Sequence, residues 1–299
     1  MTRLRVRGLL LVVGVLMSAC GSPSATTPAR SVSPDTSAVA TSTPAPTPTP
    51  TPTPPPAHVF VIVLENRSYQ QAMAQPYLAG LAAQYGVATN YQAVAHPSLP
   101  NYLAITSGST WGIRDDGFHA LPNSGLTAQL DAAGITWKAY EEGFTGNCFS
   151  SPYPYALKHN PFAYYGDRCP SQVVPFSQLQ ADLAGTMPQF AWLGPDMCHS
   201  GHDCSTATAD RWLSTVVPQI TASDAWKQSG TLYITWDESN GFSNQVALLV
   251  VAPNLQTHTS GAALGHFALA GTIADQLGVP RQYQSVGAGS VTQAFGISR

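Results

Sequence analysis

Charge is scarce in this 299-residue chain, since Asp, Glu, Lys and Arg together make up only 10% of it. A typical soluble domain is about one quarter charged, so the surface of this protein must be polar without being strongly ionic. Basic residues are especially few, because residues 57–299 hold nine Lys and Arg against 15 Asp and Glu. A protein that binds nucleic acid normally presents a basic face to the phosphates. The composition therefore excludes nucleic acid as an expected partner.

Proline is unevenly distributed, with 11 of the 25 prolines between residues 21 and 56, where Thr and Pro alternate over 47–56. This segment has no apolar periodicity and cannot bury enough surface to offset the entropy lost on ordering it. Residues 21–56 are therefore predicted to be a disordered linker. Residues 57–299 are long enough for one large domain, and a collagen-like or polytopic membrane protein is excluded.

The N-terminus has the pattern of an export signal. Three arginines within the first seven residues precede an apolar run over 9–17, which is too short to span a bilayer as a mature helix. The ending LMSAC resembles a bacterial lipobox, in which Cys20 is lipidated, although Met17 departs from the usual Leu, Val or Ile. An ordinary signal peptide is the alternative. Residues 1–20 are predicted to direct export to the cell surface or periplasm, where lipidated Cys20 is the protein's membrane anchor unless the protein is released in soluble form.

The remaining cysteines are even in number, which suits disulfides in an exported protein. Of the three possible connectivities we favour Cys148 with Cys169 and Cys198 with Cys204, because each pair closes a short local loop. A zinc site is the competing interpretation, since His199 lies between the second pair, as does His202. The C-x₂-C spacing of structural zinc sites is absent, which argues against it.

Segments typical of strands alternate along residues 57–299 with segments typical of helices. Expected strands lie at 59–64, 135–140, 189–193, 231–236 and 246–251. Expected helices lie at 76–85, 97–106, 126–133, 209–227 with an interruption at Pro218, and 267–277. This alternation predicts an α/β fold in one domain, with a mostly parallel sheet sandwiched by helices.

Acidic or amide side chains follow three of the expected strands. They are Glu65 with Asn66, then Asp196, then Asp237 with Glu238. Ligands in such sheets gather at the carboxyl ends of the strands, and carboxylates that share a small volume repel one another unless a cation neutralises them. Oxygen ligands suit Mg²⁺, Ca²⁺ or Mn²⁺. One divalent metal ion is therefore the expected cofactor.

Ser98 lies at the expected start of a helix, where backbone N–H groups and the helix dipole stabilise an anion. A serine at this position is most often only a helix cap. Ligation of its hydroxyl to a metal would instead lower the pKa of the hydroxyl and make it a nucleophile. Five histidines lie in polar segments near the proposed active-site loops, where imidazolium groups suit phosphate oxygens and leaving alkoxides: His96, His159, His199, His202 and His266.

Six segments together resemble the phosphoesterase family, which holds bacterial acid phosphatases and phosphatidylcholine-type phospholipases C. They are ENRSY at 65–69, HPSLPNY at 96–102, KHNPF at 158–162, PDMCHSGHD at 195–203, WDE at 236–238 and GHFAL at 265–269. The resemblance implies an alkaline-phosphatase-like fold and hydrolysis of phosphate esters at a metal. His199-Ser200 and Ala268 depart from residues that many relatives have at these positions.

The resemblance also implies roles for single residues. The metal ligands would be Glu65, Asn66, Ser98, Asp237 and Glu238. Ser98 would also be the nucleophile and pass through a phosphoseryl intermediate, and His202 or His266 would be the general acid. The substrate's phosphate would be bound by His96, His159, Asn101 and Asp203.

Two enzymatic interpretations remain open, an acid phosphatase acting on phosphate monoesters and a phospholipase C acting on lipid head groups. We favour monoesters, because no additional lipid-binding domain is evident. A sulfatase is disfavoured, since the C/S-x-P-x-R segment is absent. An alternative from another class is a non-catalytic surface lipoprotein.

Aromatic residues over 153–165 are expected either to line the leaving-group site or, preferably, to pack under the Cys148–Cys169 loop.

Overall fold

The structure is a computed structural model that describes residues 57–297. The predicted signal peptide, Cys20 and the linker over 21–56 lie outside the described residues. Within residues 57–297, no helix combines the length and the apolar character that a membrane span requires.

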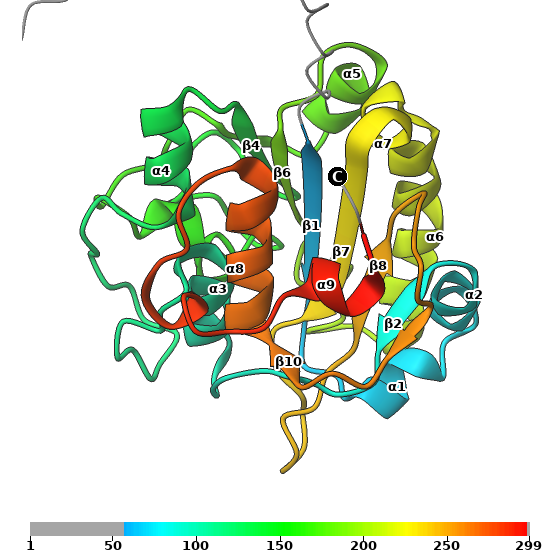
Figure 1. Cartoon of the computed structure of the whole chain (residues 1–299). Helices are drawn as coiled ribbons and strands as arrows, with labels where there is room; N and C mark the ends of the chain where they lie inside the picture. The colour runs from blue at the N-terminus through cyan, green and yellow to red at the C-terminus, as the bar shows by residue number, and fades with distance from the viewer. Residues whose placement is uncertain (1–56, 298–299) are drawn as a thin grey trace, which may run out of the picture. The chain divides into compact units, whose positions relative to one another are not determined.

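An eight-stranded sheet lies at the centre of this part of the chain, in the order β5-β4-β6-β1-β7-β8-β2-β9 (Figure 1). The strands β5, β4, β6, β1 and β7 are parallel, β8 runs antiparallel to β7, and β2 runs antiparallel to β8. Their bounds are β1 His58–Leu64, β2 Gly86–Ala88, β4 Trp137–Glu141, β5 Val173–Pro175, β6 Phe190–Gly194, β7 Gly230–Trp236, β8 Leu248–Val251 and β9 Thr259–Ser260. A separate pair joins β3 (Tyr91–Gln92) to β10 (Leu264–Gly265).

Helices cover both faces of the sheet, as Figure 1 shows. On one face lie α3 (Ser98–Ser107), α4 (Leu126–Ala133), α8 (His266–Leu277) and α9 (Val291–Phe295). On the other lie α2 (Pro76–Gln84), α6 (Thr206–Ala222) and α7 (Asp224–Ser229), with α5 (Gln178–Ala184) beside α6. The short helix α1 (Tyr69–Met73) follows β1, and 3₁₀ turns lie at η1 (Leu157–His159), η2 (Pro161–Ala163) and η3 (Tyr283–Ser285). The predicted α/β fold with a mostly parallel sheet is confirmed.

The central strands are buried on both faces, which explains their composition. The whole of β1 after His58 is buried and apolar. In β7 the sequence alternates polar and apolar residues, yet every residue is buried. Two of its polar side chains are satisfied internally, since Thr235 Oγ1 donates to Ala247 O at 2.9 Å and the Tyr233 hydroxyl donates to Gln276 Oε1 at 2.8 Å.

The structure corrects the single helix expected over 209–227. The chain forms α6 and then α7, and the break falls at Ser223, while Pro218 remains inside α6. The cause is a capping residue, since Ser223 is extended and its side chain accepts a hydrogen bond from Trp226 N at 3.2 Å. An N-cap serine therefore decides this boundary.

Both favoured disulfides are present, Cys148 with Cys169 and Cys198 with Cys204. The thiols are consumed in these bonds, so the alternative of a zinc site built on them is wrong. The second disulfide closes the loop that follows β6 and carries His202.

Candidate functional site

Two neighbouring parallel strands, β1 and β7, end side by side and deliver three predicted ligands. Glu65 and Asn66 follow β1, and Asp237 follows β7. Asn66 has φ 56°, a left-handed conformation that asparagine tolerates better than most residues. In this conformation its backbone N–H donates to Asp237 Oδ1 at 3.0 Å, and its Nδ2 donates to Glu65 Oε2 at 3.3 Å. The structure thus brings these three residues together.

Ser98 is the first residue of α3 and is buried against the carboxylate of Glu65. Its Oγ donates to Glu65 Oε2 at 3.0 Å, while the Tyr102 hydroxyl, one turn later, donates to Glu65 Oε1 at 2.5 Å. His159 Nε2 lies 3.2 Å from Glu65 Oε1, and the His159 ring stacks on Tyr102 with centroids 5.3 Å apart. Glu65 is therefore the centre of the predicted site.

The three carboxyl groups have very different affinities for protons. Burial acts to raise the pKa of Glu65, but the charges of His159 and Lys158 and the Tyr102 hydroxyl outweigh it and lower that pKa to about 2. Burial, together with the charges of Glu65 and Glu238, raises the pKa of Asp237 well above its ordinary value. Burial also raises the pKa of Glu238 to about 7, with His96 acting in the opposite direction.

Glu65 and Asp237 offer oxygen donors of the kind that a divalent cation binds, although among the described residues the His, Cys, Asp and Glu cluster with ligand atoms within 4.8 Å of one another is Glu142, Asp196 and His199. Asp237 is fully buried, and its Oδ2 has no hydrogen-bond partner among the described residues. A buried, unpaired carboxylate oxygen is costly unless a proton or a cation neutralises it. The donor set of Glu65, Asn66, Ser98, Asp237 and Glu238 consists of oxygens, which hard cations such as Mg²⁺, Ca²⁺ and Mn²⁺ prefer.

The predicted phosphate-binding histidines lie at the edge of this site. His96 Nδ1 is in contact with Glu238 Oε2, and the His96 side chain is about half exposed. Lys158 Nζ lies 3.3 Å from His202 Nε2, which must accept this hydrogen bond because an ammonium only donates. Nδ1 of His202 therefore carries the proton and donates to Asp203 Oδ1 at 2.7 Å. In this state His202 is neutral.

Two charged residues near the site had no assigned role in the sequence analysis. Lys158 Nζ donates to Asp116 Oδ2 at 3.0 Å, and Asp116 Oδ1 accepts from the backbone N–H of Leu99 at 3.0 Å. Burial acts to lower the pKa of Lys158, but Asp116, Glu65 and Asp237 raise it above its usual value. The KHNPF segment could have indicated Lys158, whereas Asp116 lies in an irregular loop without any recognisable pattern.

The structure contradicts the role expected for Asn101. Its Oδ1 accepts from the backbone N–H groups of Val94 and Ala95, both at 3.0 Å. Its Nδ2 donates to Ala95 O at 3.0 Å and to Pro97 O at 3.1 Å. Because the buried amide is fully used by this loop, Asn101 holds the chain that leads to Ser98 and does not bind substrate.

The structure also contradicts a general-acid role for His266. Its Nε2 lies 2.6 Å from the backbone oxygen of Asp237, so this nitrogen donates, and its Nδ1 lies 2.9 Å from the Tyr91 hydroxyl. The residue is completely buried, and burial lowers the pKa of His266 to about 4. A neutral imidazole with both nitrogens bonded inside the protein positions Asp237 instead of protonating a leaving group.

Asp196 does not join the Glu65 site, although it too follows a parallel strand. It groups instead with Glu142 and His199, whose potential ligand atoms lie within 4.8 Å of one another. His199 Nδ1 lies 2.8 Å from Glu142 Oε2, and the indole N–H of Trp212 donates to Glu142 Oε1 at 2.9 Å. This second cluster could also hold a cation, but its atoms already bond to one another.

The preferred interpretation of the aromatic segment is confirmed. Tyr155, Phe162, Tyr164 and Tyr165 are buried, and of the five predicted residues only Tyr153 is exposed. Two other exposed aromatics, Phe118 and Phe149, contact each other edge to face with centroids 5.4 Å apart.

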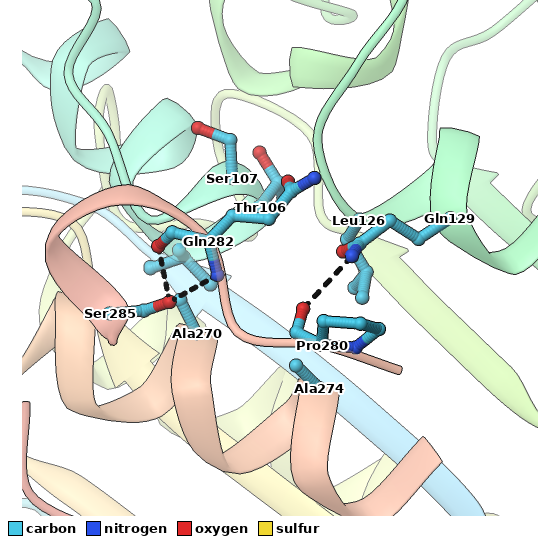
Figure 2. A pocket seen from close by; sticks show the side chains of 10 residues that line it. Thr106, Ser107, Leu126, Gln129, Ala270, Ala274, Pro280, Gln282 and Ser285 are labelled. Atoms are coloured by element: carbon cyan, nitrogen blue, oxygen red, sulfur yellow. Dashed lines mark hydrogen bonds between the residues drawn. The ribbon is translucent and has the colours of Figure 1, made fainter. Parts of the chain in front are cut away.

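A small pocket lies away from Ser98, between α3, α4, α8 and η3 (Figure 2). It contains about 10 Å³, and the buried Oε1 of Gln282 beside it has no hydrogen-bond partner among the described residues. This space suits one buried water. Thr106 lines the pocket and follows Ser98 by eight residues in α3, a separation of about 12 Å along the helix, so the pocket is not part of the site.

Comparisons with known proteins show which phosphatases this chain resembles. A probable acid phosphatase of Kluyveromyces lactis is 32% identical over 206 residues, which are 62% of this chain and 49% of that protein. A phosphatidylinositol-3-phosphatase of Mycobacterium tuberculosis is 29% identical over 251 residues, or 80% of this chain and 82% of that protein. The chain spans about half the length of several acid phosphatases that it matches.

Solved structures support the fold. A protein in the alkaline phosphatase superfamily from Vibrio parahaemolyticus superposes with a TM-score of 0.55 at 13% identity, covering 79% of this chain and 70% of that one. The model of the Phosphoesterase family matches residues 70–271. Because this match covers most of the described residues and includes the segments that carry Ser98, Lys158 and Asp237, the chain belongs to the phosphoesterase family.

Proposed function

We propose that this protein is an exported, metal-dependent hydrolase of phosphate monoesters that uses Ser98 as its nucleophile. The observation that carries the proposal is the position of Ser98, buried at the start of α3 with its hydroxyl 3.0 Å from Glu65 Oε2. Relatives named acid phosphatase support the reaction class.

The low pKa of Glu65, about 2, makes this carboxylate too weak a base to take the Ser98 proton at neutral pH. The hydroxyl must therefore be made more acidic by another group. A divalent cation bound by Glu65, Asn66, Ser98, Asp237 and Glu238 would supply this acidification and neutralise the carboxylates. The unpartnered Oδ2 of Asp237 supports this assignment.

The proposed chemistry has two steps. Ser98 Oγ bonds to phosphorus while the bond from phosphorus to the leaving-group oxygen breaks, and water then cleaves the phosphoserine to release phosphate. The proton that Ser98 Oγ loses passes to His202 Nε2, which gives up its hydrogen bond from Lys158, and the protonated His202 then donates this proton to the leaving-group oxygen while Asp203 holds Nδ1. His96 and His159 contribute positive charge beside the carboxylates when they are protonated.

A phosphodiesterase of the phospholipase C type is the second candidate. It is favoured by the exposed pair Phe118, which lies on the loop of Asp116, and Phe149, which follows β4, because two apolar rings suit an apolar leaving group. The phosphate of a diester carries one negative charge where that of a monoester carries two, and the same serine nucleophile can attack either.

Hydrolysis of p-nitrophenyl phosphate and p-nitrophenyl phosphorylcholine, with and without EDTA, tests the proposal. We expect the first to be the better substrate, with turnover lost in EDTA and restored by a divalent metal. Preference for the second would support the phospholipase C alternative. An intact, metal-bound protein that hydrolyses neither would support the alternative of a non-catalytic surface lipoprotein.

We also propose that residues 1–20 direct export and that Cys20 is lipidated. The sequence LMSAC supports this proposal. Expression of the wild type and of Cys20→Ser in a bacterial host fed a labelled fatty acid tests it. Label should enter the wild type alone, and equal labelling of both proteins, or of neither, would contradict lipidation at Cys20.

A further inference from the structure

The start of α3 is already bound to an anion from the protein itself. Pro97 precedes the helix and offers no side-chain cap, so the first N–H groups of α3 need another partner. Asp116, from the loop between α3 and α4, supplies it, with Oδ1 3.0 Å from the backbone N–H of Leu99. The carboxylate of Asp116 therefore lies at the N-terminal end of α3, where a phosphoryl oxygen of the substrate is expected from the sequence.

The second oxygen of the same carboxylate is held by a cation. Asp116 Oδ2 lies 3.0 Å from Lys158 Nζ, which also donates to His202. A helix N–H and an ammonium are the groups that proteins use to bind phosphate oxygens. Asp116 thus occupies a position whose two donors would suit a phosphate equally well.

This position adjoins the proposed nucleophile. Leu99 follows Ser98 directly, and Lys158 precedes His159, which lies 3.2 Å from the carboxylate that accepts the hydrogen bond of Ser98 Oγ. A phosphoryl group attacked by Ser98 therefore arrives beside both donors. Its negative charge and that of Asp116 repel each other at this distance, so the two do not share the donors.

We propose that Asp116 is a built-in competitor of the substrate's phosphate, and that the substrate displaces its carboxylate from Leu99 N–H and Lys158. The inference rests on the proposed function, since it concerns the same site. Asp116 is about one third exposed, so its side chain has solvent to move into. Displacement favours a doubly charged monoester over a singly charged diester, because the stronger anion competes better for both donors.

Titration calorimetry with inorganic phosphate on the purified, metal-loaded protein tests this role. Asp116→Asn keeps an oxygen for Leu99 N–H but removes the competing charge, so phosphate should bind about tenfold more tightly, equivalent to about 1.4 kcal/mol. Lys158→Met should weaken binding in the wild-type background. In the double variant the gain from Asp116→Asn should shrink, because the two residues share one contact.

Asp115→Asn is the matched control, since Asp115 is the adjacent acid and bonds to the exposed His119 and to Gly117 N instead of to the site. It should leave phosphate affinity unchanged. Weaker phosphate binding by Asp116→Asn would overturn the proposal and make Asp116 a support for Lys158. An equal gain in phosphate affinity in both variants would show that the gain comes from the lower net negative charge alone, and this result would also overturn the proposal.

Hydrogen exchange of the wild type gives a second test that needs no variant. Saturating phosphate should increase amide exchange over residues 112–118, because the loop loses its contact with α3, whereas slower exchange there would contradict displacement. Both tests measure binding without turnover. A protein that shows these responses but hydrolyses no phosphate ester would refute the proposed function and leave the competitor role standing. A protein that hydrolyses phosphate esters but shows neither response would refute the competitor role and leave the proposed function standing.

Discussion

Replacing Asp237 by Asn should stabilise the metal-free protein while abolishing its activity. Asp237 is fully buried next to Glu65, which holds a negative charge because its pKa is lowered to about 2. The pKa of Asp237 is raised well above its ordinary value of 3.8 by burial and by Glu65 and Glu238, so without a cation the protein environment disfavours its charged form. A buried polar atom left without a partner typically costs about 1–3 kcal/mol, and a charged one costs more.

The sign of the pH dependence follows from the raised pKa. The stability contributed by protonated Asp237 is complete below pH 3.8 and is lost as the pH rises toward the folded-state value. Asp237→Asn removes this loss and keeps an oxygen to accept the Asn66 N–H. In EDTA at pH 7 we expect its melting temperature to exceed that of the wild type by several degrees, from about 2–4 °C per kcal/mol for a domain of this size.

Differential scanning calorimetry at pH 5 and pH 7 in EDTA measures the effect, which should be clearly smaller at pH 5. Added Mg²⁺ or Mn²⁺ should raise the melting temperature of the wild type alone. A variant that melts at or below the wild type in EDTA at pH 7 would refute the reasoning, since Asp237 would then stabilise the metal-free fold. A difference independent of pH would point to packing instead of ionisation.

Three further predictions concern other parts of the molecule. His199→Ala should leave bound metal and turnover intact, because the Glu65 site and not the Glu142 cluster is assigned the catalytic cation; loss of metal by elemental analysis would move the cation to Glu142, Asp196 and His199. Asp210→Ala should lower stability by about 1 kcal/mol in denaturant titrations, since its carboxylate caps α2 through Leu78 N at 2.9 Å, and an unchanged midpoint would show the cap to be dispensable. Cys198→Ser with Cys204→Ser should cost about 2 kcal/mol and reduce turnover more than it reduces metal binding, because the opened loop carries His202; full activity would contradict the role of that loop.

The edge that carries Glu65 and Asp237 was predictable because it depends on a general rule of parallel sheets. Once β1 and β7 were recognised as buried strands, Glu65 and Asp237 had to emerge at the same edge. The rule does not decide the direction of each side chain. Asp196 emerges at that edge as well, but β6 lies beside β4 in the sheet, and Asp196 turns toward Glu142 on the β4 side.

The other differences arise from contacts between side chains and irregular backbone. The amide of Asn101 is used by the loop over 94–97, which no periodicity describes. Asp116 reaches α3 only because the loop after the helix returns over its N-terminal end. Residue patterns carry little information about where an irregular loop folds back onto a helix. The loops closed by both disulfides, in contrast, are short enough to be inferred from the spacing of the cysteines alone.

The most direct test of the central claim is a search for phosphate on Ser98 during turnover. The purified protein is mixed with p-nitrophenyl phosphate and divalent metal, quenched in acid, digested and examined by mass spectrometry. The mechanism predicts a phosphorylated peptide containing Ser98 in the wild type, and neither this peptide nor turnover in Ser98→Ala. Turnover by Ser98→Ala at the wild-type rate would contradict the assignment of Ser98 as nucleophile.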